Sequence, residues 1–390
     1  MAIDSTGEMR HAQICFVVST PMTAKAFLIG HLLALSDRYS VDLVCQSDST
    51  GMLEVLTGKV GVKSAAIERK ISLFADFQAL FRLYRLFVAN RYDVICSVTP
   101  KAGLLSLLAG FLSRSRFRVH IFTGQVWVNR RGIKRRALKI IDMLMAWLAT
   151  DLLTDSPSQR DFLIAEGVVR ADKIRVLAAG SICGVDAARF QPRPGVRDRL
   201  RLELGIPLDA VVVLFLGRMN RDKGILDLAE AFAKLAPKHE NLWLLTVGPD
   251  EESMQSRVAQ ICVSVSSRVR LIGFTNEPES FMAVADVFAL PSYREGFGSS
   301  VIEAAACGVP CLCSEIYGLT DAVVDGVTGL FHRPADIAGI RVGLERLLNP
   351  ELRKNLGEAA RARAVQDFSQ QRLTDAMLDF VDARISRRFE

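Results

Sequence analysis

Short apolar runs alternate with segments of helical periodicity along nearly the whole chain. A short apolar run bounded by turn signals predicts a buried strand, and the longer periodic segments predict amphipathic helices. In the first half we expect strands at 14–19, 41–45, 93–97, 118–122, 152–154 and 174–177. Strands and helices that alternate in this way predict a parallel, doubly wound sheet.

The alternation pauses at 187–209, where three prolines and many charges indicate a linker or boundary. It then resumes, with strands expected at 211–216, 242–247, 269–272, 287–290 and 311–313. The predicted fold class is therefore α/β, with two Rossmann-like doubly wound parallel-sheet domains facing a cleft. We expect these domains at 1–190 and 191–370, and an amphipathic helix at 371–390 that packs back on the first domain.

The helix expected at 73–89 is rich in aromatic residues. The residues that recur along it at helical spacing are Phe74, Phe77, Leu80, Phe81, Tyr84 and Phe87. Such a stripe lines a protein core more often than it binds a cofactor. We therefore assign it to the core of the first domain.

The composition is that of a globular protein in a reducing compartment. Half of the 390 residues are hydrophobic and 24% are charged, and no segment is of low complexity. Eight cysteines occur without a Cys-x-x-Cys pair or a signal peptide, which predicts reduced, packed thiols in the cytoplasm. No apolar run reaches the roughly 18 residues that span a bilayer.

The positive charge is concentrated in one segment. The formal net charge is +6, but nine basic residues and no acid lie between positions 113 and 141. Phe117, Phe122 and Trp127 are interspersed among them. Such a patch suits nucleic acid, anionic lipid headgroups or a phosphorylated acceptor, with a merely solvated face as the alternative.

The strongest candidate for chemistry is the loop and helix at 291–318, where seven residues separate Glu295 from Glu303. The loop between them contains Gly296, Phe297, Gly298 and Ser299. Its amides and the following helix N-terminus favour an anion, most naturally a phosphate. Ser300 and Glu303 also fit the spacing of a capping box, so a purely structural role for Glu303 stays open.

A second loop supplies cations at the same expected edge of the second sheet. Gly217 and Arg218 follow the strand at 211–216, and Lys223 precedes the next helix. Two further strands end at Gly248-Pro249 and at Gly273-Phe274. Cations for a diphosphate and a carboxylate for sugar hydroxyls together outline a nucleotide-sugar site.

These motifs resemble glycosyltransferase family 4, of the GT-B fold. The matching pattern is Gly217-Arg218, Lys223-Gly224, Gly248-Pro249, Gly273-Phe274 and Glu295-Gly-Phe-Gly followed by Glu303-Ala-x-Ala-x-Gly-x-Pro. The resemblance implies a retaining enzyme that needs no bound metal, and no Asp-x-Asp metal signature occurs in the chain. It implies catalytic roles for Glu295, Arg218 and Lys223.

The resemblance also implies a donor site in the second domain. In that site Glu303 would bind the ribose, Arg218 and Lys223 the diphosphate, and Glu295 the donor sugar. The implied donor-binding residues are Gly217, Arg218, Lys223, Gly273, Phe274, Glu295, Gly296, Phe297, Gly298, Ser299 and Glu303. The UDP-sugar is a co-substrate, and no other cofactor is expected.

The first domain resembles the branch that builds capsule, O-antigen or exopolysaccharide units on polyprenyl-diphosphate carriers. The implied acceptor-binding residues are Thr99, Lys101, His120, Thr123 and Gly124. Many members place a donor-contacting histidine before the glycine that matches Gly124, whereas here Thr123 stands there and His120 lies three residues earlier. For His120, a satisfied histidine at a strand end is the alternative.

The resulting hypothesis is a retaining transferase of a hexose or N-acetylhexosamine from a UDP-sugar to a polyprenyl-diphosphate-linked saccharide. A nucleotide-sugar epimerase of the same two-domain fold is the alternative. The expected partners are the nucleotide-sugar donor, the lipid-linked saccharide and an anionic membrane surface held by the cations of the basic segment beside Trp127, with no nucleic acid. We expect the enzyme in the cytoplasm, peripherally bound at the inner face of the plasma membrane.

Overall fold

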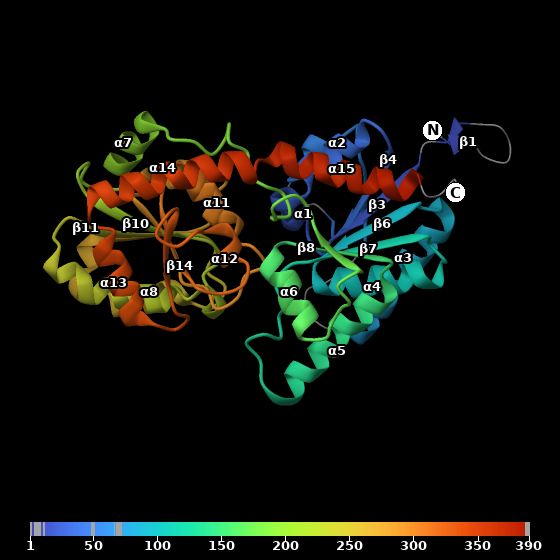
Figure 1. Ribbon diagram of the computed structural model, residues 1–390, viewed down its shortest axis with the longest axis horizontal. Coiled ribbons are helices and arrows are strands. Elements are labelled where there is room, and N and C mark those ends of the chain that lie inside the picture. The colour runs from blue at the N-terminus through green and yellow to red at the C-terminus, as the bar shows by residue number, and fades with distance from the viewer. Residues whose placement is uncertain are drawn as a thin grey trace. The chain divides into compact units, whose positions relative to one another are not determined.

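The chain forms two compact units, each built on one parallel sheet with helices on both faces (Figure 1). The computed structural model describes residues 2–3, 9–10, 12–47, 51–65, 67 and 72–386. Unit 1 comprises Met1–Cys183 with Gln370–Glu390, and unit 2 comprises Gly184–Ser369. The two parallel sheets confirm the predicted fold class.

Unit 1 contains a seven-stranded parallel sheet of order β5-β4-β3-β6-β7-β8-β9. Its strands are β3 (Gln13–Val17), β4 (Ser40–Cys45), β5 (Gly61–Ser64), β6 (Val94–Val98), β7 (Phe117–Phe122), β8 (Asp151–Thr154) and β9 (Ile174–Val176). The short strands β1 (Ala2–Ile3) and β2 (Met9–Arg10) pair separately and antiparallel. The order reverses next to β3, so the loops after β3 and β6 open at a switch point, where ligands bind in such sheets.

Helices cover both faces of this sheet. They are α1 (Pro21–Phe27), α2 (Ile29–Ser36), α3 (Leu73–Asn90), α4 (Pro100–Leu112), α5 (Gly132–Leu148), α6 (Pro157–Ala165) and α15 (Gln370–Ser386). Helices α1, α2 and α15 lie on one face, and α3, α4 and α5 lie on the other (Figure 1). The Thr20 hydroxyl accepts from the Thr23 amide at 3.4 Å and caps α1, just before Pro21.

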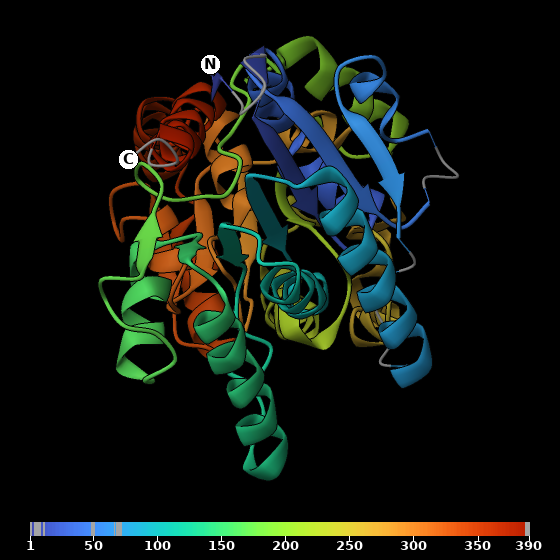
Figure 2. The ribbon, with the colours of Figure 1, turned by 90° about the vertical axis from the view of Figure 1, so that its right-hand side faces the viewer.

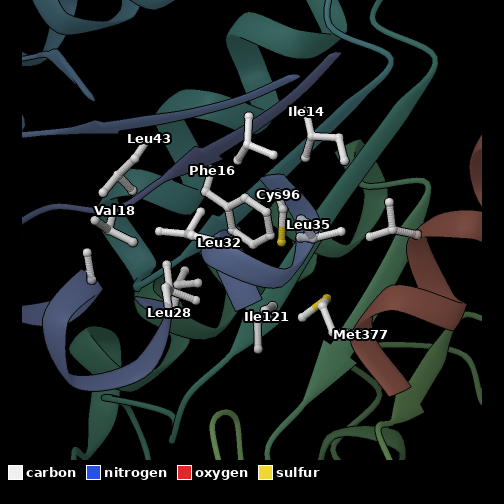
Figure 3. Packing of buried hydrophobic residues seen from close by; sticks show 14 of the residues in the cluster. Ile14, Phe16, Val18, Leu28, Leu32, Leu35, Leu43, Cys96, Ile121 and Met377 are labelled. Carbon is white, nitrogen blue, oxygen red and sulfur yellow. The ribbon is translucent and has the colours of Figure 1, made fainter. Parts of the chain in front are cut away.

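The last helix is part of the core of unit 1. Figure 3 shows Met377 of α15 beside the cluster that joins Phe16 of β3 to Leu32 and Leu35 of α2. At the far end of α15, the guanidinium of Arg384 lies 2.6 Å from a carboxylate oxygen of Asp151. Residues at the end of the chain therefore complete a core that its beginning starts.

Unit 2 contains a six-stranded parallel sheet of order β12-β11-β10-β13-β14-β15. Its strands are β10 (Val211–Leu216), β11 (Leu242–Val247), β12 (Val269–Ile272), β13 (Val287–Leu290), β14 (Cys311–Ser314) and β15 (Gly329–His332). Its helices are α7 (Pro194–Glu203), α8 (Ile225–Leu235), α9 (Met254–Ile261), α10 (Pro278–Val284), α11 (Ser299–Ala306), α12 (Leu319–Ala322), α13 (Ile337–Arg346) and α14 (Pro350–Asp367). The order reverses here between β10 and β13, which again places a switch point at the loops that follow these strands.

The segment at 187–209, whose prolines and charges indicated a linker or boundary, begins shortly after the division between the two units at Cys183 and Gly184. It contains α7, whose Arg201 is fully buried. The guanidinium of Arg201 lies 2.7 Å from the carboxylate of Asp286 and donates to the carbonyls of Ala210 and Val284. A buried arginine needs such partners, and they come from distant parts of unit 2.

The assignment of the aromatic stripe at 73–89 to the core is also wrong. Phe74 is 74% exposed and Phe77 is 68% exposed, and only Phe87 of the aromatic residues in the stripe is buried. The buried side of α3 is formed by Ala79, Leu83 and Phe87. The helix carries two apolar stripes, and helical spacing alone does not show which of them faces the sheet.

Candidate active site

The proposed donor site is built from loops at the carboxyl ends of the strands of unit 2. Gly217 follows β10 directly, and Lys223 ends a single 3-10 turn before α8. Gly224 has a φ of 68°, and a β-carbon there would lie 1.9 Å from the carbonyl oxygen of Pro291. Only glycine fits this position, because the loops after β10 and β13 touch backbone to backbone.

Lys223 and Glu295, separated by 72 positions, form a direct ion pair. The ammonium of Lys223 lies 2.5 Å from a carboxylate oxygen of Glu295, and both side chains are largely buried. The Ser292 hydroxyl donates to the same oxygen at 2.7 Å. The pair therefore holds a cation and a carboxylate in fixed positions at the end of β13.

Arg218 is held by a different carboxylate. Its guanidinium lies 3.2 Å from Glu251, and the side-chain amide of Asn220 donates to the same residue at 2.9 Å. Glu251 lies in the loop after β11, which sequence reasoning had not connected with the site. The carboxylate of Glu251 fixes the position of the Arg218 guanidinium, and a phosphate oxygen can replace that carboxylate as its partner.

The glycine loop ends in a helix N-terminus that can accept an anion. Gly298, at a φ of 84°, is the residue before α11, which begins at Ser299. Phe297 is buried and its ring packs edge-on against Phe368, with centroids 5.1 Å apart. Phe297 therefore anchors the loop, while the backbone amides around it remain the groups suited to phosphate.

Glu303 is not a capping residue. Because α11 begins at Ser299 and no acidic residue lies in its first turn, Glu303 is beyond the reach of the cap. Its side chain is half-buried, and burial raises the pKa of its carboxyl to about 7, while Arg189 lowers it and Glu279 raises it further. A carboxyl in this state can accept hydrogen bonds from hydroxyl groups once it is ionised.

The loops that follow β10, β11 and β12 adjoin one another. The Gly248 amide donates to the Gly273 carbonyl at 3.0 Å, and a β-carbon at Gly248 would lie 2.0 Å from the Gly217 carbonyl oxygen. Phe274, the residue after Gly273, is 53% exposed. The structure thus brings Gly217, Gly248 and Gly273 to one edge, and leaves an aromatic ring available beside them.

In unit 1, four of the five expected acceptor residues line one small cavity. Thr99, His120, Thr123 and Gly124 surround it, whereas Lys101 forms an ion pair with Asp76 at 2.5 Å. Thr99 adopts a φ of 76°, unusual for a β-branched residue, and its hydroxyl lies 2.9 Å from that of Ser19. Backbone strain of this kind is commonly found at functional sites.

His120 is neutral at this cavity. Its side chain is buried, and Nδ1 lies 2.9 Å from the hydroxyl of Ser97. Burial lowers the pKa of its imidazole to about 3, although a hydrogen bond to the backbone of Ser97 acts in the opposite direction. The ring can therefore donate or accept a hydrogen bond there, but it does not provide positive charge.

Asp142 lines the same cavity and was not among the expected site residues. Burial raises the pKa of its carboxyl to about 6, while the indole of Trp127 donates to it at 2.7 Å and lowers it. Its signal in the sequence was a lone acid within an apolar helical segment. The same contact corrects the role of Trp127, which is fully buried and stacked on Phe162, and so cannot anchor a membrane.

Within the described residues, no group of three or more His, Cys, Asp or Glu side chains is arranged to hold a metal ion. Across the same residues, none of the helices combines the length and apolar character that crossing a bilayer requires.

Comparison with known proteins identifies both halves of the chain. The family described as "Glycosyl transferases group 1" matches residues 196–363, and the "Glycosyl transferase 4-like domain" matches residues 31–180. The capsular polysaccharide biosynthesis glycosyltransferase CapM of Staphylococcus aureus is 32% identical over 310 residues, which are 78% of this chain and 80% of the relative. A UDP-Gal:alpha-D-GlcNAc-diphosphoundecaprenol alpha-1,3-galactosyltransferase of Escherichia coli is 24% identical over 90% of this chain and 91% of its own length.

Solved structures share the fold over nearly the whole length. Anabaena HepE, crystallised with UDP and glucose, aligns with a TM-score of 0.82 at 21% identity, covering 96% of this chain and all of HepE. WaaG, a glycosyltransferase involved in lipopolysaccharide biosynthesis, aligns with a TM-score of 0.74 at 15% identity, covering 93% of this chain and 98% of WaaG. The chain therefore belongs to glycosyltransferase family 4, a family of retaining enzymes with the GT-B fold.

Proposed function

We propose that this enzyme transfers a hexose or N-acetylhexosamine from a UDP-sugar to a polyprenyl-diphosphate-linked saccharide during synthesis of a bacterial surface polysaccharide. The single observation that carries the proposal is the Lys223–Glu295 pair beside the glycine loop and the N-terminus of α11. The names of the Staphylococcus aureus and Escherichia coli relatives, and the UDP and glucose in the HepE structure, support the substrate classes.

In this proposal the donor diphosphate binds between Arg218, Lys223 and the amides at residues 296–299. As the bond from the sugar to phosphate breaks, negative charge grows on the diphosphate and positive charge grows on the sugar. Lys223 and the helix N-terminus stabilise the first of these charges, and Glu295 stabilises the second while it positions Lys223. Glu303 accepts hydrogen bonds from the ribose hydroxyls, which fixes the nucleotide.

The acceptor half of the site would use neutral groups. The hydroxyls of Thr99 and Thr123 and the imidazole of His120 border the cavity of unit 1, and Gly124 leaves room beside them. Lys101, already compensated by Asp76, would add charge only if an acceptor phosphate displaced that carboxylate. We therefore infer that this region orients a sugar hydroxyl, which needs hydrogen bonds rather than charge.

We also propose that the enzyme acts at the inner face of the plasma membrane. The basic segment supplies charge for anionic lipids, but not all of its cations are available. Arg135 and Lys139 pair with Glu166 at 2.8 and 2.7 Å, and Arg118 donates to backbone carbonyls. The exposed cations of the segment include Arg130, Arg131, Lys134 and Arg136.

The test is a donor screen in which nucleotide release is measured against a panel of polyprenyl-diphosphate sugars. We expect release only when a UDP-sugar and a matching lipid-linked acceptor are both present, and a product that retains the anomeric configuration of the donor. Conversion of a UDP-sugar in the absence of any acceptor would indicate the epimerase instead. Transfer supported equally by acceptors without a diphosphate lipid would contradict the proposed acceptor class.

A further inference from the structure

The outward side of α3 carries an apolar stripe that none of the described residues of unit 1 covers. Phe74, Phe77, Phe81, Tyr84 and Val88 follow one another at intervals of three and four residues, and all are exposed. That spacing places them along one line of the helix surface. The stripe lies roughly opposite the buried residues of α3, so the helix is apolar on two sides.

Helix α5 repeats this arrangement. Ile133, Ile140, Leu144 and Trp147 are exposed and also fall along one line, with intervals of seven, four and three residues. The opposite side of α5 packs on unit 1 through Met145 and other buried residues. Two helices of one unit therefore each present an uncovered apolar line to the exterior.

Helix α4 lies between them (Figure 2). Its last turn exposes Phe111 and Leu112, and the ring of Phe111 lies 5.4 Å from the ring of Trp147 on α5. Leu108 and Leu104, which lie one and two turns earlier, are half-buried. We call the outward apolar side chains of α3, of the last turn of α4 and of α5 the α3–α5 face.

The charge around the α3–α5 face is predominantly positive. Residues 72–150 contain 13 lysines and arginines but only three acids. All three acids have partners within the protein. Asp76 forms an ion pair with Lys101, Asp93 accepts a hydrogen bond from the backbone amide of Gln13, and Asp142 accepts one from the indole of Trp127. Exposed arginines, in contrast, occur on α3 at 82 and 85 and before or within α5 at 130, 131 and 136.

We propose that the α3–α5 face inserts into the interfacial region of an anionic lipid bilayer. This inference rests on the proposed membrane partner and specifies the surface through which the chain reaches it. Helices with an apolar line flanked by arginines lie in the plane of such an interface, with the apolar side chains below the headgroups and the cations among them. A second copy of this chain fits less well, because two strongly positive faces would be opposed.

Trp147 is a natural probe of this insertion. Of the three tryptophans, Trp127 is fully buried and Trp243 is 8% exposed, whereas Trp147 is 65% exposed. Vesicles of phosphatidylcholine and phosphatidylglycerol in equal parts should shift its emission to the blue, and brominated acyl chains should quench it. Trp147→Phe should abolish both signals without preventing binding.

The contribution of α3 is tested with the triple variant Phe74→Ser, Phe77→Ser, Phe81→Ser. Since each phenylalanine buries a large apolar area on insertion, we expect vesicle partitioning to fall by at least about tenfold. The matched control replaces three exposed apolar residues of unit 2, as Leu202→Ser, Val263→Ser, Val342→Ser, and should partition like the wild type. Melting temperatures of both variants should stay near that of the wild type, because all six side chains are exposed.

Two outcomes would overturn the inference. One is that the protein binds the vesicles while brominated acyl chains fail to quench the emission of Trp147. Contact would then be purely electrostatic or would use another face. The other is a concentration-dependent dimer in sedimentation that the α3 variant dissociates, because the face would then join two copies. Binding of a UDP-sugar in the absence of vesicles is measured in parallel: its absence in the wild type would count against the proposed function, whereas its retention in the α3 variant isolates the membrane step.

Discussion

The loop ends of the two sheets are chemically different although the sheets are wound alike. In unit 2 the loops carry compensated charges: Lys223 with Glu295 and Arg218 with Glu251. In unit 1 the ends of β6 and β7, with the loops that follow them, place hydroxyls and the neutral imidazole of His120 around a small cavity. The charge of unit 1 is found instead on the outer surface of its helices.

This difference shows what each unit is prepared to bind. A diphosphate demands cations that are held in place before it arrives, and the carboxylates of unit 2 hold them. A sugar hydroxyl demands only directed hydrogen bonds, and a lipid carrier is held by a surface rather than by a pocket. Substitutions at three places in the molecule test the contrast.

The largest effect is expected from the ion pair of unit 2. Lys223→Ala and Glu295→Ala should each lower kcat by about 100-fold or more, because charge on the departing diphosphate and on the sugar loses its fixed counterpart. The double variant should be little worse than either single variant, because the two residues act together. Transfer kinetics measure this, with Lys234→Ala and Glu230→Ala, an exposed pair on α8, as the control. If the kcat of the double variant fell by the product of the two single losses, Lys223 and Glu295 would act independently and the prediction would be wrong.

An intermediate effect is expected from Glu303. Because burial holds its pKa at about 7, the donor-free enzyme is partly protonated near neutrality and must ionise to accept the ribose hydroxyls. Affinity for a UDP-sugar should therefore rise with pH up to about 8 and fall by up to about tenfold for each pH unit below the pKa. The intact UDP-sugar is used because the terminal phosphate of UDP itself titrates near pH 6.

Glu303→Gln should raise the donor KM about tenfold and remove this pH dependence, whereas the exposed Glu315→Gln should leave both unchanged. The pH dependence of folding stability has the opposite sign to that of donor affinity. Since the pKa of Glu303 is higher in the folded chain than its usual value, the wild type should lose stability as pH rises toward and through 7, and the variant should not. A pH profile unaltered by Glu303→Gln would remove this carboxyl from the donor site.

The smallest effect is expected in unit 1, from Gly103→Ala on α4. A β-carbon there would lie 2.3 Å from Cε1 and 2.6 Å from Nδ1 of His120, which is buried and cannot swing aside. We expect a loss of about 1–3 kcal/mol in the free energy of unfolding and a few-fold rise in the acceptor KM, with the donor KM unchanged. Gly195→Ala on α7, where a β-carbon meets nothing within 4 Å, is the control. An equal rise in the donor KM would show that this cavity serves both substrates.

The strands and the loops of unit 2 were the most predictable features. Parallel strands buried on both faces read as continuous apolar runs, and glycines mark where their loops crowd together, as at Gly224 and Gly248. The placement of Lys223 and Glu295 at one edge followed from the same order, since strand ends at a switch point share one edge, but their direct ion pair was not predicted. The partner of Arg218 did not, because nothing in the local sequence of Glu251 distinguishes it from its acidic neighbours.

Burial was the property that the sequence predicted least well. The aromatic stripe of α3 was expected in the core but is exposed, whereas Trp127 was expected at a membrane surface but is buried. A helix with two apolar sides satisfies the same periodicity whichever side faces the sheet. The indole N–H of Trp127 can be buried because it donates a hydrogen bond to the carboxylate of Asp142. The strand β15 was missed because its four residues include only two large apolar side chains, Leu330 and Phe331, which make too short an apolar run to stand out.

The return of α15 to unit 1 has a consequence for how the protein is made. Unit 2 is complete once the ribosome has passed Ser369, whereas unit 1 still lacks Met377, Phe380 and Val381 of its core at that moment. Unit 2 can therefore close without α15, whereas the core of unit 1 is complete only once α15 is present. A fragment that stops at Cys183 would leave the nascent sheet with an uncovered apolar face, and dissecting the enzyme into halves requires splicing the final helix onto the first.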